Sequence, residues 1–420
     1  LLAKAILAKK DKPLFDNLII DEYQDLTELM FISVLSLLKR NHPLSLYMFG
    51  DDNQTIQPTL FSFASCESIL KEQISHSLKL NKIFLPSSYR SGPILIDYIN
   101  SFNIKKKECI GKQKEEIDKT ESSLRDDEND LFVSYIDKEE TLLDLIKRSL
   151  TSTSLSYIFP SLFEKEYFIT TYSKLGIDRE ILSNMAFVIE EAKGMEWDSV
   201  VLIRFFSSSK NSFNSMLLNK KGKHSSFHRM LFNRFYVALT RAKNKIVIYE
   251  NDITSSIKDC FLSIPKHISS SLELDELFLD SPCYSWVSYA KSLFYNGQYK
   301  QAYLSLLRAK EKANTSDLII AKKYSNYEEE FNKNNFSNSS EYIDLFISRN
   351  DFGNLKDCYK RSGNRKKLNL LLKVFDNDSS TLELVELYKK SVELCSYQEK
   401  VFYFDKISSL LLNKIKKEIN

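Results

Sequence analysis

Two short apolar runs that each end in carboxylates constrain this chain more than any other feature. Leu18 to Ile20 stops at Asp21 and Glu22, and Leu44 to Phe49 stops at Gly50-Asp51-Asp52. Apolar runs of this length are typical of buried strands, and the carboxyl ends of parallel strands meet at one edge of a sheet. The sequence therefore predicts an α/β fold with acidic side chains gathered at that edge.

Adjacent carboxylates at a strand end suit phosphoryl transfer. One carboxylate can hold Mg²⁺ through its water shell, while the next orients or deprotonates the attacking water. Asp21 and Glu22 are therefore the candidate Mg²⁺ and catalytic residues. The alternative interpretation is a strand followed by a solvated turn, and two residues alone do not decide between the two.

Later stretches extend the pattern: Ser88-Tyr89-Arg90-Ser91, Ala192-Lys193-Gly194-Met195-Glu196-Trp197-Asp198 and Tyr236-Val237-Ala238-Leu239-Thr240-Arg241-Ala242-Lys243. With the two acid-tipped runs, they resemble in order motifs II to VI of superfamily 1 helicases, on the UvrD/Rep side. The resemblance covers about Phe15 to Tyr249. It implies two RecA-like P-loop NTPase domains, the first incomplete: its C-terminal half over 1–83, and the second domain over 84–250.

The resemblance implies ATP and Mg²⁺ as cofactors and assigns catalytic roles. Asp21 and Glu22 would act on Mg²⁺ and the attacking water, and Gln54 would contact the γ-phosphate. Arg90 and Arg241 would neutralise charge on the transferred phosphate with their planar guanidinium groups. The alternatives are a polar turn residue for Gln54 and surface ion pairs for the two arginines.

Three more residues are implied to bind the nucleotide. Tyr89 would stack on the adenine, Glu196 would accept a hydrogen bond from the ribose, and Gly194 would permit a close backbone approach. The chain also departs from the family. Ile189-Glu190-Glu191 stands where a His and a Thr often face nucleic acid, and the interval from Arg90 to Lys193 is too short for the family's full-size extra subdomain.

The phosphate-binding loop is absent from the sequence. No Gly-x-x-x-x-Gly-Lys-Ser/Thr occurs among the 420 residues, and in the family this loop precedes the acidic motif. Without its backbone N–H groups and Lys, the β and γ phosphates have no cradle. The chain starts at Leu1 without Met, in what reads as the middle of a helix, so we expect a fragment that does not hydrolyse ATP by itself.

The region 270–420 has helical spacing. Over 286–309 it follows a tetratricopeptide-like pattern, carried by Trp286, Tyr289, Ala290, Leu293, Gly297, Tyr299, Ala302, Leu306 and Ala309. This predicts an all-α, tetratricopeptide-like region after the α/β domains, with an irregular helical tail as the alternative. The combination most resembles the large eukaryotic helicase-like proteins with tetratricopeptide and ankyrin repeats, and such repeats imply a protein partner.

Charge places few limits on partners. The net charge is only +3, from 59 basic and 56 acidic residues, so any nucleic-acid surface must be a local patch. The mixed Lys, Glu and Asp of about 104–130 predict a solvated insertion in the second domain, with Lys105-Lys106-Lys107 as ordinary surface rather than a phosphate contact. The partner implied by the resemblance is single-stranded nucleic acid, DNA in preference to RNA.

Cysteine usage indicates a reducing, intracellular compartment, without separating nucleus from cytoplasm. The six cysteines are scattered and form no CxxC pair, which predicts free thiols. His224 and His228 lack further ligands at metal-binding spacing. No apolar run approaches the ~20 residues needed to cross a bilayer, so no membrane association is expected.

The sequence is consistent with two functions. The first is an ATP-dependent, UvrD-like nucleic-acid helicase or translocase, an enzyme when its phosphate loop is present. The alternative is a catalytically degenerate helicase-like scaffold that binds protein partners through its helical repeats. Glu190 and Glu191 favour the scaffold, whereas the intact acids and arginines of the motifs favour the enzyme.

Overall fold

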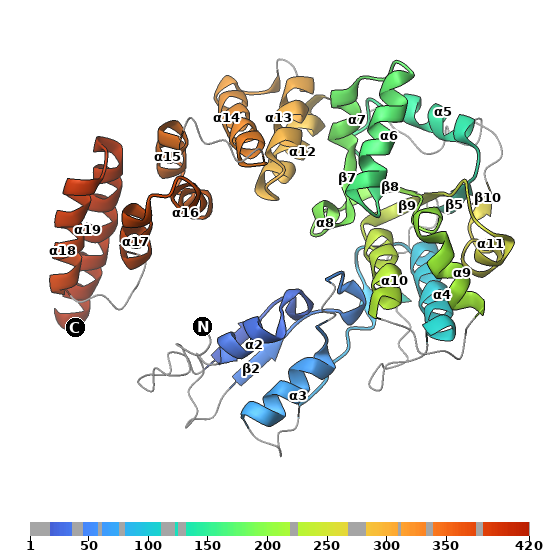
Figure 1. Cartoon of the computed structure of the whole chain (residues 1–420), viewed down its shortest axis with the longest axis horizontal. Helices are drawn as coiled ribbons and strands as arrows, with labels where there is room; N and C mark the ends of the chain where they lie inside the picture. The colour runs from blue at the N-terminus through green and yellow to red at the C-terminus, as the bar shows by residue number, and fades with distance from the viewer. Residues whose placement is uncertain are drawn as a thin grey trace. The chain divides into compact units, whose positions relative to one another are not determined.

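The structure is a computed structural model that describes residues 17–35, 45–57, 61–74, 80–110, 122–124, 132–218, 226–267, 283–309, 312–332, 339–374 and 381–419. It divides into two compact units, Leu1–Lys312 and Ala313–Asn420 (Figure 1). The predicted α/β class is confirmed for the first unit. Among its described residues, the second unit is entirely helical.

The first α/β part (17–74) contains the two acid-tipped strands. β1 (Asn17–Ile20) pairs in parallel with β2 (Ser45–Met48). The short 3-10 helices η1 (Tyr23–Asp25) and η2 (Asp52–Gln54) follow the strands, and α2 (Glu28–Leu35) and α3 (Phe63–Gln73) complete the part. Thr27 accepts a hydrogen bond from the Met30 N–H and so supports the start of α2. Both strands therefore end at one edge of this small sheet, as the sequence predicts.

The two faces of this small sheet differ. Leu18, Ile20, Leu46 and Met48 pack against the core formed with α2 and α3. On the other face, Ile19 is 68% exposed, Tyr47 55% and Phe49 54%. Parallel sheets are normally covered on both faces. Among the described residues of the first α/β part, helices therefore cover only one face of this sheet.

The second α/β part (84–267) is built on a six-stranded sheet of order β10-β5-β9-β8-β6-β7, with every pair parallel. Its strands are β5 (Phe132–Ile136), β6 (Leu155–Phe159), β7 (Ala186–Val188), β8 (Trp197–Ile203), β9 (Ala242–Tyr249) and β10 (Lys266–His267). A separate two-residue pair joins β3 (Ser87–Ser88) to β4 (Ser122–Ser123).

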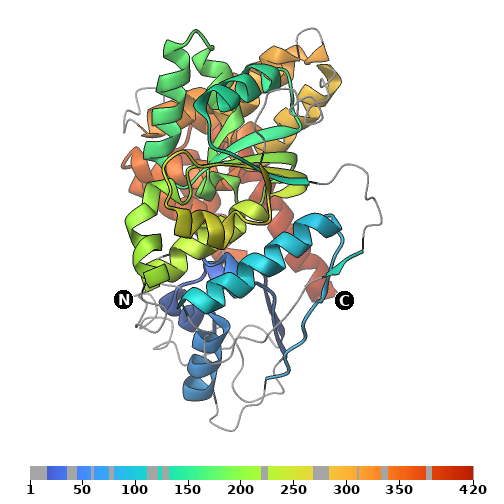
Figure 2. The same cartoon turned by 90° about the vertical axis from the view of Figure 1, so that its right-hand side faces the viewer.

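Helices cover both faces of the large sheet (Figures 1 and 2). One face carries α4 (Pro93–Ile110), α9 (Lys210–Leu218), α10 (Ser226–Leu239) and α11 (Ser255–Phe261), with an aromatic core that includes Phe102, Phe206, Phe213, Phe232, Phe235 and Phe261. The other carries α5 (Glu139–Ser149), α6 (Leu162–Lys174) and α7 (Arg179–Met185). The short α8 (Ile189–Ala192) follows β7, and η3 (Ser207–Ser209) precedes α9.

The expected charged insertion begins later than the sequence suggests. α4 continues to Ile110, so 104–110 is helical, and Lys106 is only 1% exposed. The expectation that this lysine is ordinary surface is therefore wrong. Most of the remaining expected insertion, 111–121 and 125–131, lies outside the described residues.

A helical hairpin, α12 (Cys283–Tyr295) and α13 (Tyr299–Arg308), belongs to the first unit. Leu293 and Ala302 join the core of the second α/β part. Gln301 donates to the carbonyls of Ser183 in α7 (3.0 Å) and of Ala186 at the start of β7 (3.2 Å). The units therefore divide at Lys312, whereas the helical region predicted from sequence starts at 270. The hairpin agrees with the predicted helix spacing, and its repeat class stays a prediction.

The second unit comprises α14 (Thr315–Asn332), α15 (Ser339–Ser348), α16 (Phe352–Arg361), α17 (Arg365–Val374), α18 (Thr381–Leu394) and α19 (Tyr397–Ile419). Glu399 of α19 is 1% exposed and accepts from Lys367 Nζ at 2.7 Å and from the Tyr359 hydroxyl. Burial alone would raise the pKa of Glu399, but these hydrogen bonds outweigh it and lower the pKa. This carboxylate thereby ties α16, α17 and α19 together.

Cysteines are free throughout the described residues. Cys66, Cys109, Cys358 and Cys395 are buried in the cores, and Cys260 is partly exposed. The free thiols predicted from the scattered spacing are confirmed at these five positions.

Candidate functional site

The turn after β1 holds the paired acids. Asp21 and Glu22 are both exposed, and Glu22 adopts a left-handed backbone conformation with φ 53°. The Glu22 N–H donates to Asp21 Oδ1 at 3.0 Å. Gln24 is fully buried, and its side-chain amide donates to the Glu22 carboxylate. Gln24 therefore fixes the direction of the second acid, a role that the sequence analysis did not assign.

The turn after β2 packs directly on the first turn. The Asp51 N–H donates to Gln24 Oε1 at 3.1 Å, and the Tyr23 hydroxyl donates to Asp52 Oδ1 at 3.1 Å. Asp51 also caps η2 by accepting from the Asn53 N–H at 2.9 Å. A Cβ on Gly50 would lie 2.1 Å from Gln24 Oε1, so this close approach requires glycine.

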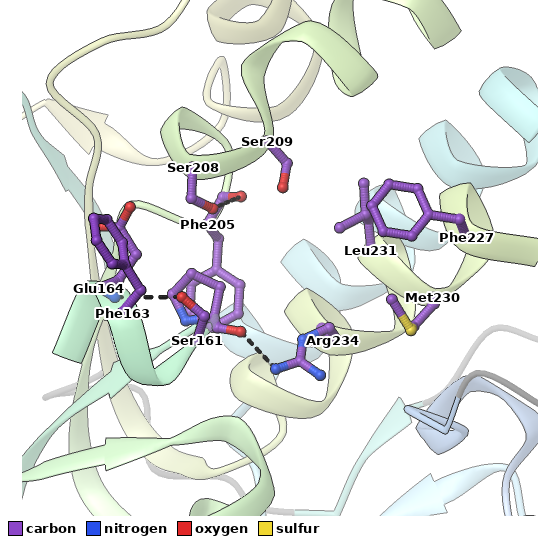
Figure 3. A pocket seen from close by; sticks show the side chains of 11 residues that line it. Ser161, Phe163, Glu164, Phe205, Ser208, Ser209, Phe227, Met230, Leu231 and Arg234 are labelled. Atoms are coloured by element: carbon purple, nitrogen blue, oxygen red, sulfur yellow. Dashed lines mark hydrogen bonds between the residues drawn. The ribbon is translucent and has the colours of Figure 1, made fainter. Parts of the chain in front are cut away.

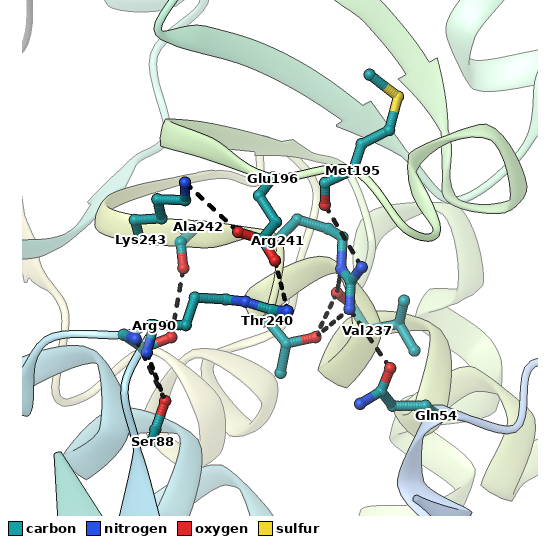
Figure 4. Close-up of polar contacts among 11 residues, drawn as sticks. Gln54, Ser88, Arg90, Met195, Glu196, Val237, Thr240, Arg241, Ala242 and Lys243 are labelled. Atoms are coloured by element: carbon teal, nitrogen blue, oxygen red, sulfur yellow. Dashed lines mark hydrogen bonds and ion pairs between the residues drawn. The ribbon is translucent and has the colours of Figure 1, made fainter. Parts of the chain in front are cut away.

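Arg241 joins the second α/β part to the first. Its Nη2 lies 3.4 Å from Gln54 Oε1, its Nη1 lies 3.4 Å from the Met195 carbonyl, and its Nε lies 3.1 Å from the Val237 carbonyl (Figure 4). The residue is 4% exposed. Burial lowers the pKa of Arg241 to about 10, and the positive charge of Arg90 adds to this effect, while Glu196 and Glu22 oppose it. Arg241 thus stays charged at neutral pH while facing Gln54.

Glu196 forms ion pairs with two cationic side chains beside Arg241. It forms an ion pair with Arg90, and Lys243 Nζ lies 3.4 Å from its other oxygen (Figure 4). Gly194 lies in the same loop with φ 83°, which favours glycine. Tyr89 is 82% exposed, so its ring is available for stacking. The structure thus brings Arg90, Glu196 and Arg241 together at the amino ends of β8 and β9.

An ion pair also joins the two α/β parts. Lys193, from the loop before β8, pairs with Asp25 of η1. Lys193 belongs to the motif stretch Ala192–Asp198, yet the sequence gives no sign that it meets Asp25. We call these contacts between the two α/β parts the joint; it includes Gln54–Arg241 and Asp25–Lys193.

Both acids of α8, Glu190 and Glu191, form ion pairs. Glu190 Oε1 lies 2.6 Å from Arg234 Nη1, and Glu191 Oε2 lies 2.7 Å from Lys165 Nζ. Glu191 also accepts from the Val188 N–H at 2.9 Å. The two acids therefore neutralise the nearest cations on this surface, which leaves less positive charge there for a phosphate backbone.

A cavity of about 460 Å³ lies at the carboxyl-end edge of the large sheet, opposite the edge that holds Arg90, Glu196 and Arg241 (Figure 3). It follows the carboxyl ends of β6 and β8, with Pro160, Ser161, Phe163, Glu164, Phe205, Ser208, Ser209, Phe227, Met230, Leu231 and Arg234 around it. None of the residues expected from the sequence to bind ATP lines this cavity. The expected site is instead a polar joint between the two α/β parts.

The donor set fits ATP and Mg²⁺ in part. Two exposed carboxylates suit Mg²⁺ held largely through water, and the Gln54 amide and the guanidinium groups of Arg90 and Arg241 suit phosphate oxygens. Within the described ranges, no three His, Cys, Asp or Glu residues gather as a metal site. His224 lies outside those ranges. None of the described helices has the length and apolar character needed to traverse a bilayer.

Comparisons with known proteins add little. No protein-family model matches the sequence, and no curated protein matches it. Among solved structures, the PRRSV helicase is similar at 16% identity with a TM-score of 0.30, over 58% of this chain and 36% of that chain. The C-terminal domain of a possible DNA helicase from Lactobacillus plantarum WCFS1 is similar at 15% identity with a TM-score of 0.26, over 43% of this chain and 98% of that domain.

These weak structural neighbours are helicases, but at such TM-scores they support no assignment. The chain spans about a third of the viral helicase chain it matches, 36% of its length. Any statement about activity must therefore rest on this chain's own site.

Proposed function

We propose that this chain supplies part of an ATP-dependent nucleic-acid helicase or translocase of the UvrD-like class. The observation that carries the proposal is the joint at which Arg241 of the second α/β part contacts Gln54 of the first. Glu22 lies near enough to act on the pKa of Arg241, and the Arg90–Glu196 pair lies beside it. Residues from separate motifs thus converge on one place.

The joint suits phosphoryl transfer between two domains. The Gln54 carboxamide can donate to a phosphate oxygen, while the charged guanidinium groups of Arg241 and Arg90 oppose the negative charge that develops there. Glu22 is directed by the buried Gln24 and can orient a water molecule. Asp21 and Glu22 would hold Mg²⁺, as the family resemblance implies, and the ion would supply positive charge against the phosphate oxygens.

The first α/β part is half of such a domain. Its sheet exposes Ile19, Tyr47 and Phe49 on one face, where a complete α/β domain has covering helices. The sequence also lacks a phosphate-binding loop. We therefore propose that the missing cradle belongs to a further α/β segment on this face, and that the 420-residue chain alone shows no ATP hydrolysis.

The test compares this chain with the protein expressed together with whatever coding sequence precedes Leu1. The proposal expects single-strand-stimulated ATP hydrolysis from the longer protein only, abolished by Glu22→Gln or Arg241→Ala. Glu72→Gln, an exposed acid on α3, is the matched control and should leave hydrolysis unchanged. Hydrolysis by the short chain, or none by a longer protein that contains a phosphate loop, overturns the proposal.

A second candidate is the catalytically degenerate scaffold, whose partner would bind the helical repeats. The ion pairs Glu190–Arg234 and Glu191–Lys165 favour it, because they remove positive charge from a surface that would grip a phosphate backbone. The scaffold predicts no measurable binding of a fluorescent oligonucleotide at about 50 mM salt. Binding that weakens steeply as salt rises would favour the motor instead.

A further inference from the structure

Lys106 is buried although it stands in a run of three lysines. Its Nζ donates to Asn53 Oδ1 at 2.6 Å and to Asn233 Oδ1 at 2.8 Å. Asn53 belongs to η2 of the first α/β part, whereas Lys106 and Asn233 belong to α4 and α10 of the second. One ammonium group therefore bridges the two α/β parts.

Asn233 also forms hydrogen bonds to the η2 turn. Its Nδ2 donates to the Thr55 carbonyl at 2.8 Å and to the Asp52 carbonyl at 3.2 Å. Thr55 is 2% exposed, and Ile56 joins the hydrophobic core of the second α/β part. The η2 turn is thus held at both ends by the second part, although its strand lies in the first.

The burial of Lys106 depends on these contacts. An ammonium removed from water needs strong hydrogen bonds to compensate, and bonds to a charged donor are among the stronger ones in proteins. The neighbouring Lys105 shows the alternative, since it is partly exposed and pairs with Glu108 at 3.1 Å. The same helix therefore places one lysine at the surface and the next in the contact between the two α/β parts.

We propose that Lys106 is a positioning residue which, with Asn233, fixes the η2 turn so that Gln54 faces Arg241. Gln54 directly follows Asn53, and its Oε1 lies 3.4 Å from Arg241 Nη2. Lys106 acts on Gln54 through Asn53 and the turn. That the positioned Gln54 contacts phosphate rests on the proposed function. That Lys106 positions Gln54 does not.

The test uses the whole chain with Lys106→Met, and with Lys105→Met as the control from the same helix. One readout is hydrogen exchange at the Gln54 and Thr55 amides, which bond to the Asp51 and Asp52 carbonyls. The other is the NMR signal of the Gln54 side-chain amide, assigned with Gln54→Glu. A general loss of stability would not single out this signal.

We expect Lys106→Met to speed exchange at the two amides roughly 10-fold or more and to shift the Gln54 signal, while Lys105→Met changes neither. If Lys106→Met does not fold, Asn53→Ala removes the partner on η2 and should give the same two changes. Wild-type exchange and an unshifted Gln54 signal in these variants overturn the proposal. Failure of the wild type to bind single strands would overturn the proposed function alone.

Discussion

Replacing Gly50 by alanine tests the packing of the two acidic turns. The added Cβ would meet Gln24 Oε1 at 2.1 Å and the Tyr23 ring at 2.7 Å, so both neighbours must move. If Gln24 moves away, the part-buried Asp51 N–H loses its acceptor and the Glu22 carboxylate loses its donor. Overpacking costs roughly 1–3 kcal/mol and the loss of a part-buried hydrogen bond roughly 0.5–1.5 kcal/mol, so we expect a loss of about 1.5 to 4.5 kcal/mol.

Urea unfolding measures this loss, and hydrogen exchange over residues 20–26 locates it. Gly353→Ala is the control, because a Cβ there meets only Asp351 Oδ1 at 3.8 Å. The control should be neutral or gain up to ~1 kcal/mol, as expected for alanine in a helix. Wild-type unfolding and exchange in Gly50→Ala would refute the argument that Gly50 is required by the contact with Gln24.

Three other perturbations test separate parts of the structure. A chain ending at Lys312 should keep the urea midpoint of the second α/β part, whereas one ending at His267 should lower it, because the hairpin shares that core. Arg241→Lys should cost roughly 2–4 kcal/mol of unfolding free energy through lost hydrogen bonds, against less than about 1 kcal/mol for Arg148→Lys, whose partly exposed side chain bonds only Asp144 among the contacts described. Burial raises the pKa of Glu250 from 4.5 to about 7, so the folded state binds this proton more tightly than the unfolded state does. The stabilising contribution of Glu250 should therefore be complete below about pH 4.5 and be lost as pH rises to 7, a change of at most about 3 kcal/mol. Glu250→Gln should flatten this pH dependence of urea unfolding, and an unchanged slope would show that Glu250 is not its source.

The strands and the joint differ in how far the sequence predicts them. The two short apolar runs predicted β1 and β2 to within a residue at each end, because strands that pack on a core need apolar side chains. The family resemblance predicted that Gln54 and Arg241 act at one phosphate. Arg241 Nη2 does lie 3.4 Å from Gln54 Oε1. Their roles stay predictions until activity is measured.

The burial of Lys106 could not be predicted from the sequence. Its neighbours are charged, so local composition indicates surface, yet its environment is decided by Asn53 and Asn233, which are 53 and 127 positions away. The hairpin α12–α13 shows the same limit. Its helical spacing was visible, but its attachment to β7 depends on the Gln301 bonds to Ser183 and Ala186.

The buried cysteines give this chain reporters of local opening without any engineered probe. Cys66 lies in the core of the first α/β part, Cys109 at the end of α4 and Cys358 in the second unit, each at most 1% exposed. Burial raises the pKa of Cys66 to about 12 and that of Cys358 to about 11, and only the thiolate reacts readily. The labelling rate at each thiol therefore reports how often its own segment opens, and comparing them ranks the stabilities of the segments within a single sample.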